Sequence, residues 1–322
     1  MADLKIEKID AEAYSKFLAN NPPSSPFSLP EFLAAYRETF STESELLSIN
    51  RNDSTVAVCA LFVGRRASQK LVKLMPIRPY DGVHFRSLES STNQKREYDV
   101  LTALQALAEY LKRNFAFYQM VFPPDTSDIR AFQWDGAQVV TNYTYVMDLP
   151  GFTEDGYTKS LREVLRGAQN SGLAGGMCGV DELVSLQQLS YERHGRRPPV
   201  SAGNLLALLK RLDAAGLLRT RCVRNKNGRV VSAMTSLIRG RGMYLYVSGT
   251  DAIAERGASH LLYHNILNEE KREGKIFVDF CGANTPSINL FKSAFGPRLA
   301  AYFRVWRANT LITRLASRFK KF

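Results

Sequence analysis

The first 140 residues change from a helical to a strand-like pattern of hydrophobic positions and back. Between residues 12 and 40, apolar side chains recur at helical spacing on either side of a proline-rich loop. Short runs rich in β-branched and aromatic residues follow at 45–50, 56–65 and 70–75, separated by turn residues. The pattern predicts helices followed by an antiparallel β-meander.

A long amphipathic helix and two strands complete this part of the chain. The strands are predicted at 117–122 and 139–149, after which Pro150 and Gly151 interrupt the pattern. We therefore place a domain boundary near residue 140. The buried stripe of the helix is predicted to consist of Leu101, Leu104, Ala108, Leu111 and Phe115.

The second half offers a similar order of elements. A helix with an apolar face at 205–212 ends at Gly216, which suits a left-handed C-cap. Further strands are predicted at 218–224, 230–238, 243–248, 275–280 and 299–307, and further helices at 258–272 and 287–295. The predicted class is α+β, a mixed α/β chain with domains at 1–140 and 141–309 and a basic tail at 310–322. No residue-level repeat proves duplication.

Composition fits a folded, soluble protein. Hydrophobic residues make up 45% of the 322-residue chain and charged residues 23%. The start of the chain lacks a secretory pattern, and the longest apolar stretch, 56–63, is too short for a membrane-spanning helix, so we predict a cytoplasmic location. The widely separated cysteines indicate reduced thiols and no metal cluster: Cys59, Cys178, Cys222 and Cys281.

Positive charge is concentrated in two places. The chain has a formal net charge of +12. The segment from Arg193 to Arg241 contains 12 Lys or Arg residues and one acid, Asp213. This segment would attract a phosphate-bearing cofactor, tRNA or anionic lipid, or it is a solvated basic face. The tail is basic without an acid and keeps Leu311, Leu315 and Phe319 on one stripe. It would contact the inner membrane peripherally, or its stripe would cap the second domain.

Three segments carry a family resemblance. They read YLYVSGTDAIAERGASHLLYHNIL from 244, KIFVDFCGANTPSI from 275 and NLFKSAFGPRLAAYFRV from 289. In this order they are similar to the FemAB/FemX-like branch of the GNAT acyltransferase superfamily, while the first half matches in element order and in the loop PYDGVHF. The resemblance implies two tandem GNAT-like domains, each a mainly antiparallel mixed sheet flanked by helices. It also implies transfer of an acyl or aminoacyl group to an amine.

A donor site is predicted at Arg256, Gly257, Ala258 and Ser259, where a helix begins after a strand. Free backbone N–H groups, the helix dipole and small side chains suit a pyrophosphate there. The resemblance implies acyl-CoA as donor. The RGAS sequence is shorter than the family's Q/R-x-x-G-x-G/A loop, so aminoacyl-tRNA stays an alternative. Close packing of helix on sheet is the other interpretation of Gly257 and Ala258.

The catalytic candidates are Lys292, Asp279 and Tyr246. The resemblance places the Phe291-Lys292 dipeptide at the transfer centre, where an ammonium would stabilise the tetrahedral oxyanion. Asp279 lies in an apolar strand, so it either orients an amine or a basic residue or accepts a hydrogen bond from the following turn. Tyr246 is the candidate proton donor.

Acceptor-binding candidates surround this centre. Tyr244, Tyr246 and Ser248 alternate along one strand and are expected on one face, where their hydroxyls would hold an acceptor or simply pack. Asn284 and Phe291 complete the predicted substrate-binding set. The acceptor would be the amine of a small molecule, an amino sugar or a cell-envelope precursor.

No metal is expected. His260 and His264 have the four-residue spacing of paired metal ligands, but no third ligand stands at a recognisable spacing. The competing hypothesis for the whole chain is a catalytically inactive GNAT-fold protein that binds RNA or an anionic membrane through its basic segment.

Overall fold

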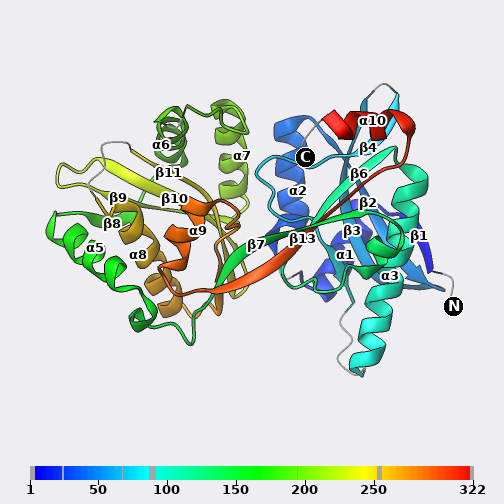
Figure 1. Ribbon diagram of the computed structural model, residues 1–322, viewed down its shortest axis with the longest axis horizontal. Helices are drawn as coiled ribbons and strands as arrows, with labels where there is room; N and C mark the ends of the chain where they lie inside the picture. Colours follow the sequence, from blue (N-terminus) through cyan, green and yellow to red (C-terminus); the bar gives the residue numbers. More distant parts are fainter. Residues whose placement is uncertain are drawn as a thin grey trace. The chain divides into compact units, whose positions relative to one another are not determined.

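The computed structural model describes residues 4–319 except 24, 67, 87–91, 194 and 252–255. The chain divides into two compact units, each built on its own part of the β-structure (Figure 1). The first unit contains Met1–Pro23, Phe27–Asn142 and Ala301–Phe322, and the second contains Ser24–Pro26 and Tyr143–Ala300. The predicted mixed α/β architecture in two parts is confirmed.

The first unit contains a six-stranded sheet with a short extra strand. Its neighbours are antiparallel except β4 and β6, which are parallel. The additional strand β5 (Val83–Phe85) pairs with β3. In sheet order the strands are β1 (Leu4–Lys8), β2 (Glu43–Arg51), β3 (Ser54–Arg66), β4 (Gln69–Val72), β6 (Phe117–Phe122) and β13 (Arg298–Ala308).

Helices cover both faces of this first sheet because alternate residues of β3 are buried on opposite sides. Cys59 and Leu61 join the core with Leu104 of α3 (Asn93–Asn114). Phe62 faces the other way, with its ring 5.8 Å from that of Tyr36 in α2. The remaining helices of the unit are α1 (Ala11–Asn20), α2 (Pro30–Phe40), α4 (Arg130–Trp134) and α10 (Leu311–Phe319), with a 3₁₀ turn at Pro26–Ser28.

The second unit has a sheet of the same kind. Its neighbours are antiparallel except β11 and β12, which are parallel. In sheet order the strands are β8 (Ala174–Met177), β9 (Leu218–Arg224), β10 (Val230–Arg239), β11 (Gly242–Thr250), β12 (Phe277–Asp279) and β7 (Gln138–Asp148).

Two helix pairs enclose this second sheet. Helices α5 (Lys159–Asn170) and α8 (Ala258–Arg272) share the main hydrophobic core with one face. Helices α6 (Val180–Arg193) and α7 (Ala202–Ala214) pack on the other, against β9, β10 and β11. Figure 1 shows the two pairs on opposite sides of the strands. Helix α9 (Pro286–Ser293) follows β12, and a 3₁₀ turn occupies Glu154–Gly156.

The two halves repeat one topology and exchange their closing strands. Each sheet has an antiparallel meander, one parallel pair and a final antiparallel strand. The final strand of the first sheet is β13, which follows β12 in sequence, and that of the second is β7, which follows β6. The strand predicted at 299–307 was assigned to the second domain, and the basic tail at 310–322 was placed after it. The structure instead assigns residues 301–322 to the first unit. Alternation predicts a strand but does not indicate its partner.

Most predicted elements agree with the structure to within a few residues. Strand β9 and helix α8 occupy the predicted 218–224 and 258–272. The short edge strands β1 and β8 were not predicted, and β12 covers 277–279 instead of 275–280. Of the helices in the described part of the chain, none is long and apolar enough to cross a bilayer.

Candidate functional site

The parallel strands β11 and β12 pair over three residues and then separate. Their last paired residues are Tyr244 and Asp279. The chain beyond Asp279 follows β7 instead, since the N–H of Phe280 donates to the carbonyl oxygen of Tyr145 at 2.8 Å. Strand β11 itself continues to Thr250. The carboxyl-terminal part of β11 thus has no paired residue on β12, and this opening lies beside the turn that follows β12.

That turn is held by a buried carboxylate. Cys281 and Gly282 have φ angles of 51° and 102°, and the second favours glycine. Asp279, 2% exposed, accepts hydrogen bonds from the N–H of Cys281 and from the hydroxyl of Thr144, each at 2.7 Å. The same hydroxyl accepts from the N–H of Gly282 at 2.8 Å. Of the two interpretations of Asp279, the hydrogen bond to the turn is the one that the contacts show.

Lys292 holds the same turn from its other side. Its ammonium, in the last turn of α9, donates to the carbonyl oxygens of Phe280 and Gly282 at 2.5 and 2.7 Å. Burial lowers the pKa of Lys292, and the nearby Cys281 and Asp279 act in the opposite direction. An ammonium has three N–H donors, so one is left without an acceptor among the described residues. The structure therefore brings Lys292 and Asp279 together on one turn.

Aromatic rings join α9 to α8 next to this turn. The ring of Phe291 lies 4.7 Å from that of His260 and 5.0 Å from that of Tyr263, and Phe295 packs against the same cluster. Burial, followed by the charge of Arg256, lowers the pKa of His260. Phe291, predicted to bind substrate, is thus half-buried between the two helices.

His264 has partners of its own and does not pair with His260. Its Nδ1 lies 3.4 Å from the hydroxyl of Tyr157 and 3.3 Å from the side-chain nitrogen of Asn268. Burial lowers its pKa, whereas Glu154 raises it. Across the described residues, no three His, Cys, Asp or Glu side chains are placed to hold a metal ion.

The start of α8 combines close packing with free backbone donors. Gly257 has a φ of 98°, and a Cβ there would stand 2.9 Å from the Cβ of Ala168 and 3.1 Å from the carbonyl oxygen of Val164, both in α5. No side chain among the described residues caps this helix start. Ala258 is buried and Arg256 is exposed, while residues 252–255 of the predicted motif lie outside the described part. Packing therefore explains Gly257, and the first N–H groups of α8 have no capping side chain among the described residues.

Ser259 links this helix start to the end of β11. Its hydroxyl lies 2.8 Å from that of Thr250, which lies 3.1 Å from that of Ser232 in β10. Ser259 therefore already has a partner inside the protein. A ligand at the helix start would be held by the backbone N–H groups more than by this hydroxyl.

A β-bulge changes the predicted arrangement of Tyr244, Tyr246 and Ser248. Thr235 and Ser236, which are consecutive in β10, pair with Val247 and Leu245 of β11. Tyr246, between these two partners, is therefore the extra residue of the bulge. Before the bulge, Leu245 faces the core shared with α8. After it, Gly249 faces α6, because its Cβ would stand 2.3 Å from the backbone nitrogen of Gln187. Tyr244 and Ser248 consequently lie on opposite faces, and the prediction of a single face is wrong.

Asn284 serves the backbone of β7. Its side-chain oxygen accepts from the N–H of Tyr143 at 2.8 Å. Tyr244 is 4% exposed with its ring 5.6 Å from that of Phe277, whereas Tyr246 is half-buried and Ser248 exposed. Ser248 and Asn284 are thus exposed, Tyr246 is half-buried, and Tyr244 is buried.

A cationic groove on α5 was not found from the sequence. It has a volume of about 390 Å³ and is lined by Lys159, Arg162, Arg166 and His264, among others. The three α5 cations are exposed, and none forms an ion pair with a carboxylate in the described part of the chain. Their spacing of three and four residues is the signal that could have predicted this stripe. The same helix packs against Gly257.

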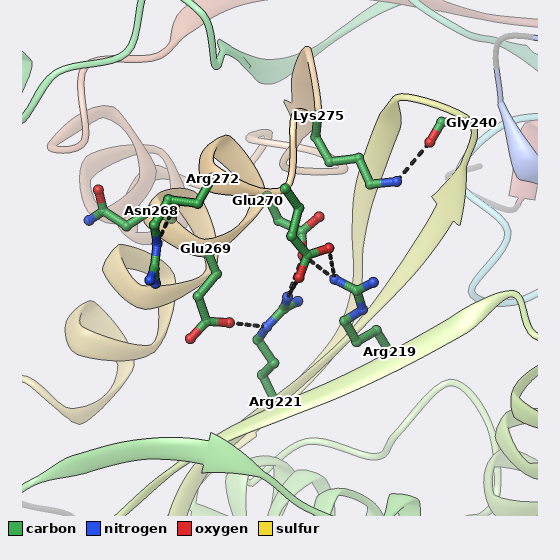
Figure 2. A network of polar contacts seen from close by, with 9 residues as sticks. Arg219, Arg221, Gly240, Asn268, Glu269, Glu270, Arg272 and Lys275 are labelled. Atoms are coloured by element: carbon green, nitrogen blue, oxygen red, sulfur yellow. Dashed lines mark hydrogen bonds and ion pairs between the residues drawn. The ribbon is translucent and has the colours of Figure 1, made fainter.

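Part of the basic segment is neutralised within the fold. Figure 2 shows Arg219 and Arg221 of β9 pointing at the carboxylates of α8. Glu270, 0% exposed, pairs with both arginines, and Glu269 pairs with Arg221. Other pairs from this segment are Lys210 with Asp181, Arg224 with Glu182 and Arg229 with Asp251. The segment is therefore not one uniform basic surface.

Comparison with known proteins finds a family match within the second unit. The profile of the Acetyltransferase (GNAT) domain matches residues 159–293. The second unit contains a GNAT domain. The match spans α5 to α9 and includes the parting strands, the α8 start and Lys292. A search of curated proteins by sequence finds no match.

Solved structures extend the likeness to the whole chain. FemX has 12% identity, covers 98% of this chain and 99% of its own, and gives a TM-score of 0.67. L-PGS from Bacillus licheniformis has 14% identity, covers 97% of each chain and gives 0.58. A tandem GNAT protein from the clavulanic acid biosynthesis pathway has 11% identity, covers 96% and 99%, and gives 0.53. These likenesses show the fold, and they confirm the FemX-like, tandem GNAT architecture inferred from the sequence.

Proposed function

We propose that the second unit transfers an acyl or aminoacyl group from a thioester or tRNA donor to an amine. The observation that carries this proposal is the parting of β11 and β12 beside a turn fixed by Asp279 and Lys292. An opening between strands exposes backbone donors, and a rigid turn with a cation at its edge is pre-organised for a developing oxyanion. The GNAT match over the same residues supports this assignment.

The donor's phosphates are proposed to bind at the start of α8. The N–H groups of Gly257, Ala258 and Ser259 begin a 15-residue helix that no side chain of the described residues caps, and the helix dipole attracts an anion there. Arg256 is exposed next to them and adds a positive charge. The α5 cations offer a second cationic stripe on a helix that packs on α8. These features suit both acyl-CoA and aminoacyl-tRNA.

The transfer itself requires no covalent enzyme intermediate. The acceptor's amine nitrogen attacks the carbonyl carbon, and the carbonyl electrons move to its oxygen. The added nitrogen loses one proton to solvent, and the tetrahedral intermediate collapses and expels the donor's thiolate or ribose oxygen. We assign the remaining N–H of Lys292 to the oxyanion, because its other two donors are held by carbonyls. Tyr246, half-buried at the bulge, is assigned to protonate the leaving group. Asp279 is a positioning residue that fixes the turn.

The acceptor is proposed to be an amine on a small molecule, an amino sugar or a cell-envelope precursor. Ser248 and Phe291 are proposed to contact it, since both lie near the opening, whereas Tyr244 and Asn284 are proposed to shape its walls. We place the reaction in the cytoplasm, peripheral to the inner membrane.

A donor comparison tests the proposal. The full chain is mixed with acetyl-CoA or aminoacyl-tRNA, thermal stabilisation is recorded, and transfer to a panel of amines is followed in a single turnover. We expect one donor to stabilise the protein and to transfer its group, with RNase sensitivity if that donor is tRNA. Salt-sensitive RNA or vesicle binding without stabilisation or transfer by either donor would overturn the proposal in favour of a non-catalytic binding protein.

A further inference from the structure

Strand β1 forms an open edge of the first sheet. Among the described strands its one neighbour is β2, with which it pairs antiparallel over its whole length. Just after the strand, the N–H of Ile9 donates to the carbonyl oxygen of Leu46 in β2 at 2.9 Å. In an antiparallel ladder every second residue bonds to the same neighbour, so the backbone groups of Leu4, Ile6 and Lys8 point away from β2. This edge therefore presents N–H and C=O groups to a further strand.

A hollow lies on each side of this edge. The first, of about 380 Å³, lies between β1 and α3, and its lining includes Leu4, Ile6 and Tyr110. These three side chains are half-buried and pack against the core that β1 shares with α3. The second hollow, of about 800 Å³, is lined by Lys5 and Glu7 among others. Because the side chains of a strand alternate between two faces, those of an added strand would have space on both faces beside β1.

The sequence of β1 is complementary to itself. It reads LKIEK over residues 4–8, so an antiparallel second copy centred on Ile6 places each Lys5 opposite a Glu7. Opposite charges directly across two strands stabilise the pair, whereas like charges there destabilise it. Both side chains are exposed, by 76% and 44%, and they already lie 2.5 Å apart within one strand. Edge strands of monomeric proteins are often protected by charges that repel a second copy, but here each charge meets its opposite.

We propose that β1 pairs with β1 of a second copy of this chain, antiparallel and about a two-fold axis at Ile6. The outward backbone groups of Leu4 then bond those of the second copy's Lys8, and the two Ile6 residues bond each other. An unrelated strand would also satisfy these groups, but only the matching charges of a second copy follow from the sequence of β1 itself. A strand of five residues buries little area, so the dimer is weak and reversible. The inference concerns the first unit and does not depend on the transfer reaction.

Sedimentation velocity of the full chain over a range of concentrations tests this inference. Lys5→Glu and Glu7→Lys each place like charges across the pair, whereas an equimolar mixture of these two variants places opposite charges there again. Ile6→Pro removes an N–H that points outward, so it interrupts the new ladder and spares the bonds to β2. The matched control is Lys226→Glu, which reverses an exposed lysine of the second unit. Thermal melting confirms that each variant is folded.

We expect the wild type and the control to sediment as monomer and dimer, in proportions that change with concentration. Each charge variant should dimerise about tenfold more weakly or less, because two favourable cross-strand pairs become repulsive. Ile6→Pro should have a similar effect, and the mixture of charge variants should recover the dimer. A wild type that stays monomeric at every concentration, or a dimer that Ile6→Pro leaves intact, would overturn the inference. A mixture that stays monomeric would also overturn it, since the antiparallel register would then be wrong.

Discussion

Exchanging Lys292 for methionine removes an ammonium while keeping a side chain of similar length. The carbonyl oxygens of Phe280 and Gly282 then lose donors that stand at 2.5 and 2.7 Å. A buried acceptor without a donor costs about 1–3 kcal/mol. Phe280 is 1% exposed, whereas Gly282 is half-buried and its carbonyl can recruit water. We therefore expect the free energy of unfolding to fall by about 2–4 kcal/mol.

The chemical effect of the same exchange is separate from this loss of stability. If the third N–H of Lys292 stabilises the oxyanion, turnover falls about ten- to a thousandfold with little change in donor affinity. Arginine at this position keeps the charge but not the compact donor geometry, so it restores the rate only in part. Asp279 and its hydrogen bonds to the turn are unchanged in both variants.

Two measurements on the same samples separate these effects. Chemical denaturation gives the free energy of unfolding, and single-turnover transfer at saturating donor gives the rate under conditions where each variant is folded. Lys275→Met is the matched control, because that lysine also donates to a backbone carbonyl, of Gly240 at 2.7 Å, and it precedes β12 whereas the turn follows it (Figure 2). A folded methionine variant with the wild-type rate would refute the catalytic assignment. Lys292 would then be structural, and Tyr246 would be the remaining candidate.

Three further predictions follow from buried positions. Gly257→Val should destabilise the fold by about 2 kcal/mol or more, since a positive φ and contact with α5 exclude a side chain, and a wild-type melting temperature would contradict this. Glu270→Leu should cost about 3 kcal/mol because it removes the buried carboxylate that Arg219 and Arg221 share and leaves the buried Arg221 with the half-exposed Glu269, whereas Glu270→Leu with Arg221→Leu should recover most of the loss in denaturation experiments; equal losses would contradict the pairing. Burial, followed by the charge of Arg78, lowers the pKa of His84 from 6.5 to about 4. The unfolded chain therefore binds a proton in this range that the folded chain does not, so the contribution of His84 is complete above pH 6.5 and declines by about 3 kcal/mol toward pH 4. His84→Gln should lose less stability over that range, and parallel wild-type and variant curves would exclude this origin.

The sequence by itself determined the local structure and the family. Period-two and period-3.6 patterns located strands such as β9 and helices such as α8, because each element buries one face of its own. The segments around RGAS, DFCGAN and FK carried the resemblance to FemX-like GNAT proteins. The domain match then confirmed GNAT over residues 159–293, and the fold is similar to that of FemX. Lys292 and Asp279 were chosen from these segments, and they do meet at one turn.

Only the tertiary structure decided which strands and faces come together. The exchange of β7 and β13 between the two sheets depends on pairing across more than a hundred residues, about which alternation says nothing. One extra residue at the β11 bulge moved Ser248 to the opposite face from Tyr244. Leu311 and Leu315 of α10 are exposed in the first unit, where Thr313 of the same helix donates to the carbonyl oxygen of Ala116. In each case a contact with another element selects between local alternatives that the residue pattern alone leaves open.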